Sequence, residues 1–447
     1  MTKAEFIIAE IGSTITKVSA FAGISTPTPR FLGQGISLTT VKEGDVKIGF
    51  ERAKQRLEEE SSIDTKSAEF MASASAAGGL RMSVHGLTRD MTLRAAREAS
   101  LGAGANLVYT TAGIISDDDL NDIVASSPNL ILLAGGIDYG DREVVLANAR
   151  KIAGSASFAP VIYAGNRSVA SVIRRIFNNT GKTLWVVDNV YPAIDELNVK
   201  PVRDIIHEVF SRHIVNAPGM EKIKTLLTGD VIPTPGAVLK AAELLYKEMG
   251  DLVTVDVGGA TTDIHSVTAG SRTFSAMRIA PEPFSKRTVE GDLGVFLNAR
   301  RVEEASGTRL QGIEQLKSIP ETEDEKAVTL ELTRLAAGLA LWRHAGELKV
   351  AYGAFGRNEL VDGRDLTAVR SIIGTGGALT RLGGGEEILS SIKRDPARRK
   401  LLPKEDARIF LDRDYIMASA GVLSHKAPEA ALNLLLASLK ISARSRV

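Results

Sequence analysis

The chain has 447 residues, a formal net charge of +1, 44% hydrophobic and 5% aromatic residues, and no cysteine. This length predicts two to four domains with aliphatic cores, and the balanced charge provides no field that would attract nucleic acid or an anionic membrane. The lack of cysteine excludes disulfides, iron–sulfur clusters, thiolate metal sites and cysteine nucleophiles.

The first segment has the pattern of a β-meander, with strands expected at 4–11, 15–22 and 30–38. Because Met1 leads directly into this pattern, we expect no signal peptide. No apolar run approaches the roughly 18–20 residues that cross a bilayer, so we expect a cytoplasmic protein that binds no membrane. A helix over 43–60 with apolar residues at helical spacing and a strand over 68–74 complete a first lobe, residues 1–77.

Short aliphatic strands then alternate with helices, which is typical of a doubly wound parallel sheet. The strands are expected at 106–113, 129–136, 160–166 and 183–189, and the helices at 88–101, 116–126, 141–153 and 166–178. This alternation predicts a separate inserted domain at 78–215. A segment rich in proline and glycine, 189–235, would return the chain to the first lobe.

The pattern of the first lobe restarts after residue 236 and predicts a second lobe, residues 216–447. A helix over 236–249 leads to a strand over 252–257, and further strands at 261–268 and 272–279 repeat the meander. Further helices are expected at 294–305, 323–349, 385–394 and 414–440.

Two similar turns follow the first strand of each meander. In "VDVGGATTD", Asp256 stands at the exit of a buried strand, and Gly258 and Gly259 leave backbone N–H groups uncovered. Successive uncovered N–H groups bind phosphate oxygens, and a carboxylate beside phosphates needs a cation such as water-held Mg²⁺. "EIGSTITK" has the same parts in the same order, with Glu10 as its carboxylate and Lys17 added.

A third glycine turn, from Gly374 to Gly377, lies between a strand and a helix and would let a nucleoside approach the backbone. A single acidic–Gly–Gly turn at a strand end is usually only a hairpin. Two matched turns, each opening a meander, together with the third turn favour a nucleotide site.

The three turns resemble the first phosphate, second phosphate and adenosine motifs of the actin/Hsp70/sugar-kinase ATPases. The matching stretches are "AEIGSTITK", "VDVGGATTD" and "IIGTGGAL", and their order and spacing fit over 1–75 and 236–440. The resemblance implies an α/β fold with two actin-like (ribonuclease H-like) ATPase lobes and an inserted doubly wound α/β domain. One departure concerns Glu10, because that superfamily usually has aspartate there.

Within that superfamily, the whole chain resembles the MutL/GlmL-type accessory proteins of adenosylcobalamin-dependent mutases, such as glutamate mutase and ornithine aminomutase. The supporting stretches include "SASAAGGLRMSVHGLTRD", "LLAGGIDYG", "NVYPAIDELNV" and "TVEGDLGV". The resemblance implies a slow Mg²⁺-dependent ATPase that acts as a reactivating chaperone and releases damaged cobalamin from the mutase. Mutase subunits are the expected partners, cobalamin belongs to them, and a homodimer is compatible with the sequence.

The resemblance also implies roles for single residues. Asp256 would position Mg²⁺ and the attacking water, Glu10 would complete the outer shell of the metal, and Lys17 would neutralise developing charge. The phosphates of ATP would be held by Gly12, Ser13, Thr14, Thr16, Gly258, Gly259, Ala260 and Thr261. The adenosine pocket would be lined by Gly374, Gly376, Gly377 and Ala378.

Several interpretations stay open at this point. Asp263 is either a neighbour of the metal site or a carboxylate that stabilises the turn, and "EGDLG" (290–294) is expected to cap a helix, either near the catalytic base or as a purely structural feature. His265 follows Asp263 in an Asp-x-His pattern, but Thr268 stands where a cobalamin-binding motif has glycine, so we expect no cobalamin ligand.

An alternative function is that of a small-molecule kinase or an ATP-dependent hydrolase of the same superfamily. Such enzymes add a substrate-specific base, and no further Asp–His pair stands at a suitable strand end. The activators of hydroxyacyl-CoA dehydratases are excluded, because their iron–sulfur cluster requires cysteine. A filament-forming structural protein is a more distant alternative.

Overall fold

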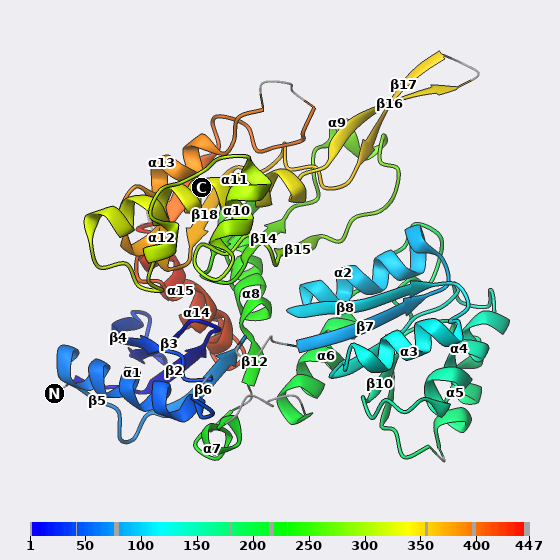
Figure 1. The fold of residues 1–447 in the computed structure, drawn as a ribbon, viewed down its shortest axis with the longest axis horizontal. Coiled ribbons are helices and arrows are strands. Elements are labelled where there is room, and N and C mark those ends of the chain that lie inside the picture. The colour runs from blue at the N-terminus through cyan, green and yellow to red at the C-terminus, as the bar shows by residue number, and fades with distance from the viewer. Residues whose placement is uncertain are drawn as a thin grey trace. The chain divides into compact units, whose positions relative to one another are not determined.

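The computed structural model describes residues 2–41, 43–75, 80–178, 180–213, 219–229, 231–353, 356–395 and 399–441 (Figure 1). The chain divides into two compact units. The first comprises residues 1–77, 216–279 and 284–447, and the second comprises residues 78–215 and 280–283. The residues on either side of both predicted limits of the inserted domain, 77/78 and 215/216, lie outside the described residues.

Two five-stranded sheets with the same strand pattern form the frame of the first unit. The first sheet consists of an antiparallel meander, β2 (Phe6–Ile11), β3 (Ile15–Ala22) and β4 (Arg30–Leu38), continued beside β2 by the parallel strands β6 (Glu69–Ala74) and β12 (Val231–Pro233). The second sheet repeats this order with β13 (Leu252–Val257), β14 (Thr262–Val267), β15 (Ser285–Glu290), β18 (Ser371–Thr375) and β19 (Arg408–Leu411). The duplication confirms the predicted pair of actin-like lobes.

A layer of three helices packs between these two sheets: α8 (Thr234–Met249), α14 (Met417–Leu423) and α15 (Pro428–Ser438). Their apolar side chains share one core with Ile8 of the first sheet and Leu252 of the second. Gly421 lets α14 approach α8 closely, because a Cβ atom there would lie only 1.9 Å from the carbonyl oxygen of Ala237. The two sheets are therefore held on a common helical layer.

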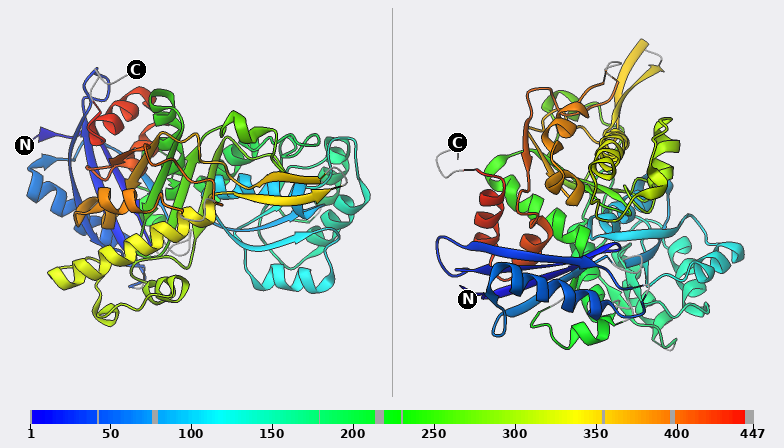
Figure 2. Two further views of the ribbon diagram at one scale, coloured as in Figure 1. Left: turned by 90° about the horizontal axis from the view of Figure 1, so that it is seen from above. Right: turned by 60° about the vertical axis from the view of Figure 1, so that its left-hand side comes forward.

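Other helices cover the outer faces of the two sheets. On the first sheet lies α1 (Val46–Ser61), whose buried residues Val46, Phe50, Ala53 and Leu57 follow the spacing of one helical face. On the second lie α10 (Ala299–Ser306), α11 (Glu323–His344), α12 (Gly377–Arg381) and α13 (Gly385–Ser391), around a separate apolar core. In Figure 2, β16 (Glu347–Gly353) and β17 (Gly356–Asp362) form a hairpin that extends from the second lobe.

The second unit contains a five-stranded parallel sheet in the order β11-β10-β9-β7-β8. Its strands are β7 (Leu80–Gly86), β8 (Ala105–Ala112), β9 (Leu130–Leu133), β10 (Val161–Tyr163) and β11 (Leu184–Val186). They alternate with α2 (Arg94–Gly102), α3 (Asp117–Ala125), α4 (Glu143–Gly154) and α5 (Ala170–Phe177). The order reverses at β7, as a doubly wound fold requires, so the predicted fold class holds for this unit as well.

Some predicted elements are wrong. The strand expected over 272–279 is instead a helical turn, α9 (Arg272–Ser275), and the third strand of the second meander is β15. Ser271 caps this turn by accepting a hydrogen bond from the Phe274 N–H (3.4 Å), and residues 280–283 join the second unit before the chain returns to the sheet. Residues 268–284 therefore separate the second and third strands of this meander, and the sequence pattern does not predict this insertion.

Two long predicted helices are shorter than expected. The helix over 323–349 ends at His344, and β16 follows. The region 414–440 forms two helices, since Pro428 starts a new helix, where its missing N–H costs nothing. The segment expected to return the chain contains α6 (Lys200–His213) and α7 (Met220–Lys224). None of the helices in the described ranges combines the length and the hydropathy that a bilayer span requires.

Candidate functional site

A cleft of about 250 Å³ lies between the two lobes of the first unit, and both acidic glycine turns line it. In the β2–β3 turn, the Gly12 N–H donates to the Ile15 carbonyl (3.0 Å); in the β13–β14 turn, the Gly258 N–H donates to the Thr261 carbonyl (2.9 Å). The two turns thus have the same backbone bond at the same position. They also touch, because a Cβ atom at Gly259 would lie 3.0 Å from Cγ2 of Thr14.

The second turn is held from its outer side. Its carbonyl oxygens accept hydrogen bonds from the chain that follows β15: Gly258 from Val295 (3.2 Å), Gly259 from Leu297 (2.7 Å), and Ala260 from the side chain of Asn298 (2.7 Å). The N–H groups of Gly259, Ala260 and Thr261 have no acceptor within the described residues. A run of free N–H groups beside a cleft is suited to an anion.

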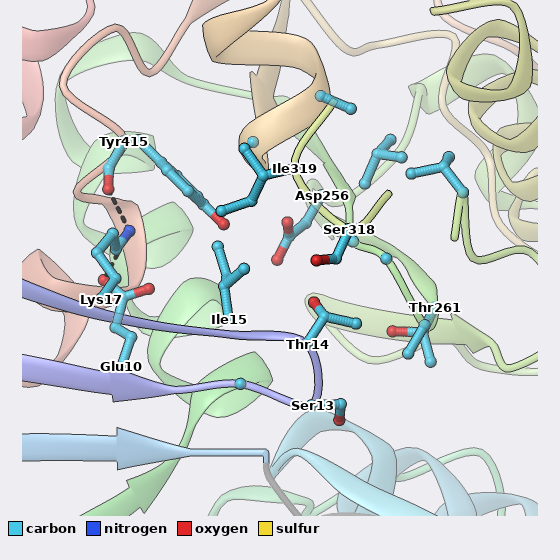
Figure 3. A pocket seen from close by; sticks show the side chains of 18 of the residues that line it. Glu10, Ser13, Thr14, Ile15, Lys17, Asp256, Thr261, Ser318, Ile319 and Tyr415 are labelled. Carbon is cyan, nitrogen blue, oxygen red and sulfur yellow. Dashed lines mark hydrogen bonds and ion pairs between the residues drawn. The ribbon is translucent and has the colours of Figure 1, made fainter. Parts of the chain in front are cut away.

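Glu10 and Lys17 form a cross-strand pair at the base of the first turn. The Lys17 ammonium lies 3.0 Å from Oε1 of Glu10, and the same oxygen accepts hydrogen bonds from the backbone N–H (3.1 Å) and the hydroxyl of Ser419. Lys17 also donates to the backbone carbonyl of Tyr415, and its Nζ lies 3.4 Å from the centre of the Tyr415 ring (Figure 3). Both charges are therefore paired inside the cleft.

Asp263 is paired as well. Its Oδ1 accepts hydrogen bonds from Nε (2.7 Å) and Nη2 (2.6 Å) of Arg287, while its Oδ2 accepts one from the Thr261 hydroxyl (3.1 Å). These contacts stabilise the turn, and Asp263 also lines the cleft and acts on Asp256 through its charge, so the structure is compatible with both interpretations. "EGDLG" caps no helix: Arg343 binds Glu290 (2.7 Å) and Asp292 (2.8 Å), and the next helix begins only at Ala299.

Asp256 differs from these carboxylates. It lines the cleft, and no ion pair of the described residues includes it. Burial, followed by the charges of Asp263 and Glu10, raises the pKa of Asp256 to about 7, although Lys17 acts in the opposite direction. A carboxylate in this position is stabilised by an added cation. Groups of three or more His, Cys, Asp or Glu side chains that could enclose a metal by themselves are absent from the described parts of the chain.

These features fit a magnesium ion bound mainly by phosphate oxygens and water, because Mg²⁺ usually keeps several waters and takes one or two carboxylates. Asp256 is the carboxylate that would hold such waters. Oε1 of Glu10 already contacts Lys17 and Ser419, so only Oε2 of Glu10 could interact with a metal-bound water.

Most of the predicted site residues meet at this cleft. Its lining includes Glu10, Gly12, Ser13, Thr14, Lys17, Asp256, Gly258, Gly259, Ala260, Thr261, Gly377 and Ala378. Thr16 does not line it: as a neighbour of Lys17 on a strand, it points to the opposite face, where it bonds to Thr39 (2.9 Å). Thr16 therefore holds the turn and is not placed to bind phosphate.

Gly374 and Gly376 do not line the cleft either. A Cβ atom at Gly374 would lie 2.8 Å from side-chain carbons of Leu389 and Leu411, in the core. At Gly376 a Cβ atom would lie 2.3 Å from the carbonyl oxygen of Val257, and φ is +93°. Gly376 therefore has to be glycine and Gly374 lies in close packing, while Gly377 and Ala378 line the cleft.

Three further features of the cleft were missed in the sequence. Tyr415 enters from the turn after β19, Arg381 from α12, and the segment 318–320 from the chain before α11. Asn298, which fixes the second turn, was missed too. None of these residues lies in a glycine-rich motif, and Tyr415 reaches Lys17 across 398 positions of sequence, so no local pattern reveals it.

Comparisons with known proteins agree over nearly the full chain. The model of the family described as MutL protein matches residues 6–439. The curated protein named Protein MutL from Clostridium tetanomorphum is 35% identical over 458 aligned residues, which cover 96% of this chain and 98% of that protein.

Similarity to solved structures is lower. Nucleotide-free acetone carboxylase has a TM-score of 0.41 at 9% identity, over 95% of this chain and 70% of that chain. The nucleotide-free diol dehydratase-reactivating factor has a TM-score of 0.35 at 10% identity, over 95% and 100% of the two chains. A xylulose kinase from Lactobacillus acidophilus has a TM-score of 0.33 at 11% identity, over 99% and 90%.

Proposed function

The chain belongs to the MutL protein family, and we propose that it is an ATP-binding and ATP-hydrolysing reactivating chaperone of an adenosylcobalamin-dependent mutase. In this role it promotes the release of damaged cobalamin, so that intact cofactor can enter. The mutase is an aminomutase, such as ornithine aminomutase, or a carbon-skeleton mutase, such as glutamate mutase.

The observation that carries the nucleotide part of the proposal is the meeting of two equivalent turns in one cleft. The second turn, Lys17 and the helix start at Gly377 surround the space, and among the described residues the N–H groups of 259–261 in the turn have no acceptor and Asp256 forms no ion pair. Phosphoryl transfer requires mainly positioning and charge neutralisation, and this cleft offers both. Magnesium would supply positive charge beside the phosphates, Asp256 would hold its waters, and Lys17 would neutralise a phosphate oxygen.

The mutase part of the proposal is supported by the stretches that resemble the MutL/GlmL-type accessory proteins. One of these, "LRMSVHGLTRD", forms β7 and its exit, and "LLAGGIDYG" forms the end of β9 and its exit, so the residues after both strands lie at the carboxyl-terminal edge of the second unit's parallel sheet. We assign mutase binding to this second unit, which has its own buried core.

A reconstituted system tests the proposal. An adenosylcobalamin-dependent mutase of the same organism is inactivated by exchange of its cofactor for cyanocobalamin, and the chain is added with MgATP and free adenosylcobalamin. We expect cyanocobalamin release and recovery of mutase activity only with hydrolysable ATP. No heat of ATP binding in calorimetry would refute the nucleotide part. ATP turnover that is stimulated by a small metabolite, with no mutase present, would instead indicate a kinase or hydrolase.

A further inference from the structure

Tyr415 stands between the two halves of the cleft, and its backbone is fixed. The backbone carbonyl of Asp412 accepts a hydrogen bond from the Tyr415 N–H (2.8 Å). The Asp412 carboxylate accepts hydrogen bonds from the backbone N–H groups of Ile416 (3.1 Å) and Met417 (2.8 Å). The Asp412 carboxylate is anchored in turn by the hydroxyls of Thr375 (2.9 Å) and Ser438 (2.6 Å). Tyr415 has φ of +53°, an uncommon value for a residue other than glycine. Such strain persists only where the surroundings impose it.

The Tyr415 ring covers one side of the Lys17 ammonium. An ammonium group has three N–H donors. Lys17 donates one to the Tyr415 carbonyl, its Nζ lies 3.0 Å from Oε1 of Glu10, and the ring centre lies 3.4 Å from Nζ. A cation over a ring at this distance is attracted to its face. The remaining side of Lys17, which a phosphate oxygen would need, is therefore occupied by the ring.

The phenol group reaches the other half of the cleft. It interacts with the backbone N–H of Gly377, at the start of α12, and a Cβ atom at Gly377 would lie 3.9 Å from Cε1 of Tyr415. Figure 3 shows the side chain running from Lys17 across the cleft toward Ile319 and Asp256. One side chain thus contacts both a cationic group and a backbone donor that the proposed nucleotide would use.

The volume of the cleft agrees with a site that the Tyr415 side chain partly fills. Its volume of about 250 Å³ is below the roughly 300–1,000 Å³ typical of pockets for ligands of this class. This volume is consistent with a side chain that fills part of a larger site. The Tyr415 ring can turn about its χ angles while the hydrogen bonds of Asp412 keep its backbone in place.

We propose that the Tyr415 ring occupies part of the nucleotide site while no nucleotide is bound, and that ATP displaces the ring and thereby uncovers Lys17. This inference rests on the proposed ATP site. It makes nucleotide binding a competition between the ring and the nucleotide for the Gly377 N–H and for one face of Lys17. The opposite arrangement, in which the ring stacks on the bound base, predicts effects of opposite sign.

Calorimetry of MgATP binding to the full chain separates the two arrangements. Tyr415→Gly removes the ring and tolerates the positive φ, and Tyr415→Phe removes only the hydroxyl. We expect Tyr415→Gly to bind ATP at least about threefold more tightly, which corresponds to the loss of the competing contact between the ring and Lys17, and Tyr415→Phe to change in the same direction by less. The matched control is Tyr352→Gly, on the exposed face of β16, and should bind like the unaltered chain.

Kinetics and spectroscopy make the test independent of stability. We expect KM for ATP to fall in Tyr415→Gly with kcat nearly unchanged, because Lys17 keeps Glu10 and the backbone carbonyl. In the chain with ¹³C-labelled tyrosine, the ring signal that is missing from Tyr415→Phe should shift when ATP is added. Weaker or equal ATP binding by both variants, or an unmoved Tyr415 signal, overturns the inference while the ATP site stands. Absence of ATP binding by the unaltered chain overturns both.

Discussion

Asp256 is the residue on which the proposed chemistry depends most directly. Asp256→Asn keeps the shape of the side chain and removes the charge that would hold metal-bound water. We expect the single-turnover rate of phosphate release to fall at least about 100-fold, as when a preorganised electrostatic group is lost, with a much smaller effect on ATP affinity. Asp118→Asn, on the exposed first turn of α3, is the control. Near-normal phosphate release by Asp256→Asn would show that the site is misplaced.

His85 predicts a dependence of stability on pH. It is fully buried at the end of β7, between the hydroxyls of Thr111 (2.9 Å) and Ser83 (3.2 Å), and burial lowers its pKa from 6.5 to about 4. Between these two values the unfolded chain binds a proton that the folded chain does not. The contribution of His85 to stability is therefore complete above about pH 6.5 and is lost as the pH falls toward 4, on the order of 3 kcal/mol.

Thermal unfolding of the second unit, followed between pH 7.5 and 4.5, measures this effect. We expect a steep fall in melting temperature for the unaltered chain and a shallower one for His85→Gln, which keeps a polar group beside the two hydroxyls and cannot titrate. His425→Gln serves as the control for loss of an exposed histidine. Equal pH slopes for the unaltered chain and His85→Gln would contradict this account.

At this scale the sequence predicts some side chains and not others, for physical reasons. The carboxylate at each strand exit and the glycines of each turn are local features, so Glu10 and Asp256 could be placed in the cleft in advance. Alternation along β3 puts Thr16 and Lys17 on opposite faces, and applying it would have excluded Thr16. The pairing of Lys17 with Tyr415 and Ser419 depends on how β3 meets the start of α14, which no local pattern contains.

The contact between the two turns gives a prediction for elements as units. At Gly259, a Cβ atom would lie 3.0 Å from Cγ2 and 3.1 Å from Oγ1 of Thr14. Gly259→Val should therefore force the turns apart and weaken ATP binding by more than about tenfold, since a displacement near 1 Å is costly for a positioned ligand. Gly291→Val is the matched control, because no atom lies within 4 Å of its Cβ position. Calorimetry with MgATP compares the two, and equal affinities would contradict the proposed grip.

Two helical glycines should respond to alanine in opposite directions. At Gly338, within α11, a Cβ atom would make an ordinary contact at 3.6 Å with Ile392, so Gly338→Ala should stabilise the first unit by about 0.5–1 kcal/mol through helix propensity. At Gly421 it would meet the Ala237 carbonyl at 1.9 Å, so Gly421→Ala should destabilise by roughly 1–3 kcal/mol. Urea unfolding of both variants measures this, and a shift of the same sign in both would refute the packing of α14 on α8.

Elements with strong periodicity were predictable and interrupted ones were not. The apolar spacing of α1 and the aliphatic runs of β9, β10 and β13 are explained by burial. The third strand of the second meander is not predicted correctly from the sequence. It is β15, and the residues just before it, 280–283, belong to the second unit. The helix over 323–349 was extended too far because the residues of β16 continue with helix-compatible side chains, and only the pairing with β17 makes them a strand.

At the scale of the whole molecule, the repeated strand order in the first unit explains why the pair of lobes could be predicted. Each lobe consists of a meander, helices and two parallel strands. This order occurs twice along the chain, with one inserted domain. The arrangement of Asp256, Lys17 and Tyr415 follows only when both sheets pack on α8 and α14. Local sequence patterns therefore predict the two lobes, whereas the arrangement of the cleft depends on how the lobes pack together.

The division into two units predicts separable functions. The second unit has its own apolar core, including Ile131, Val161 and Ile173, whereas every residue that lines the cleft belongs to the first. Replacing residues 80–213 by a short Gly-Ser linker should therefore preserve MgATP binding within about threefold and abolish binding to the mutase. The segment 280–283 then loses its contacts with the second unit, so Arg94→Ala in the full chain controls for the loss of the Arg94–Glu282 ion pair. Calorimetry with ATP and co-sedimentation with the mutase give the two measurements.

Retained mutase binding by the shortened chain would place the docking surface on the first unit, and lost ATP binding would show that the units depend on each other for folding.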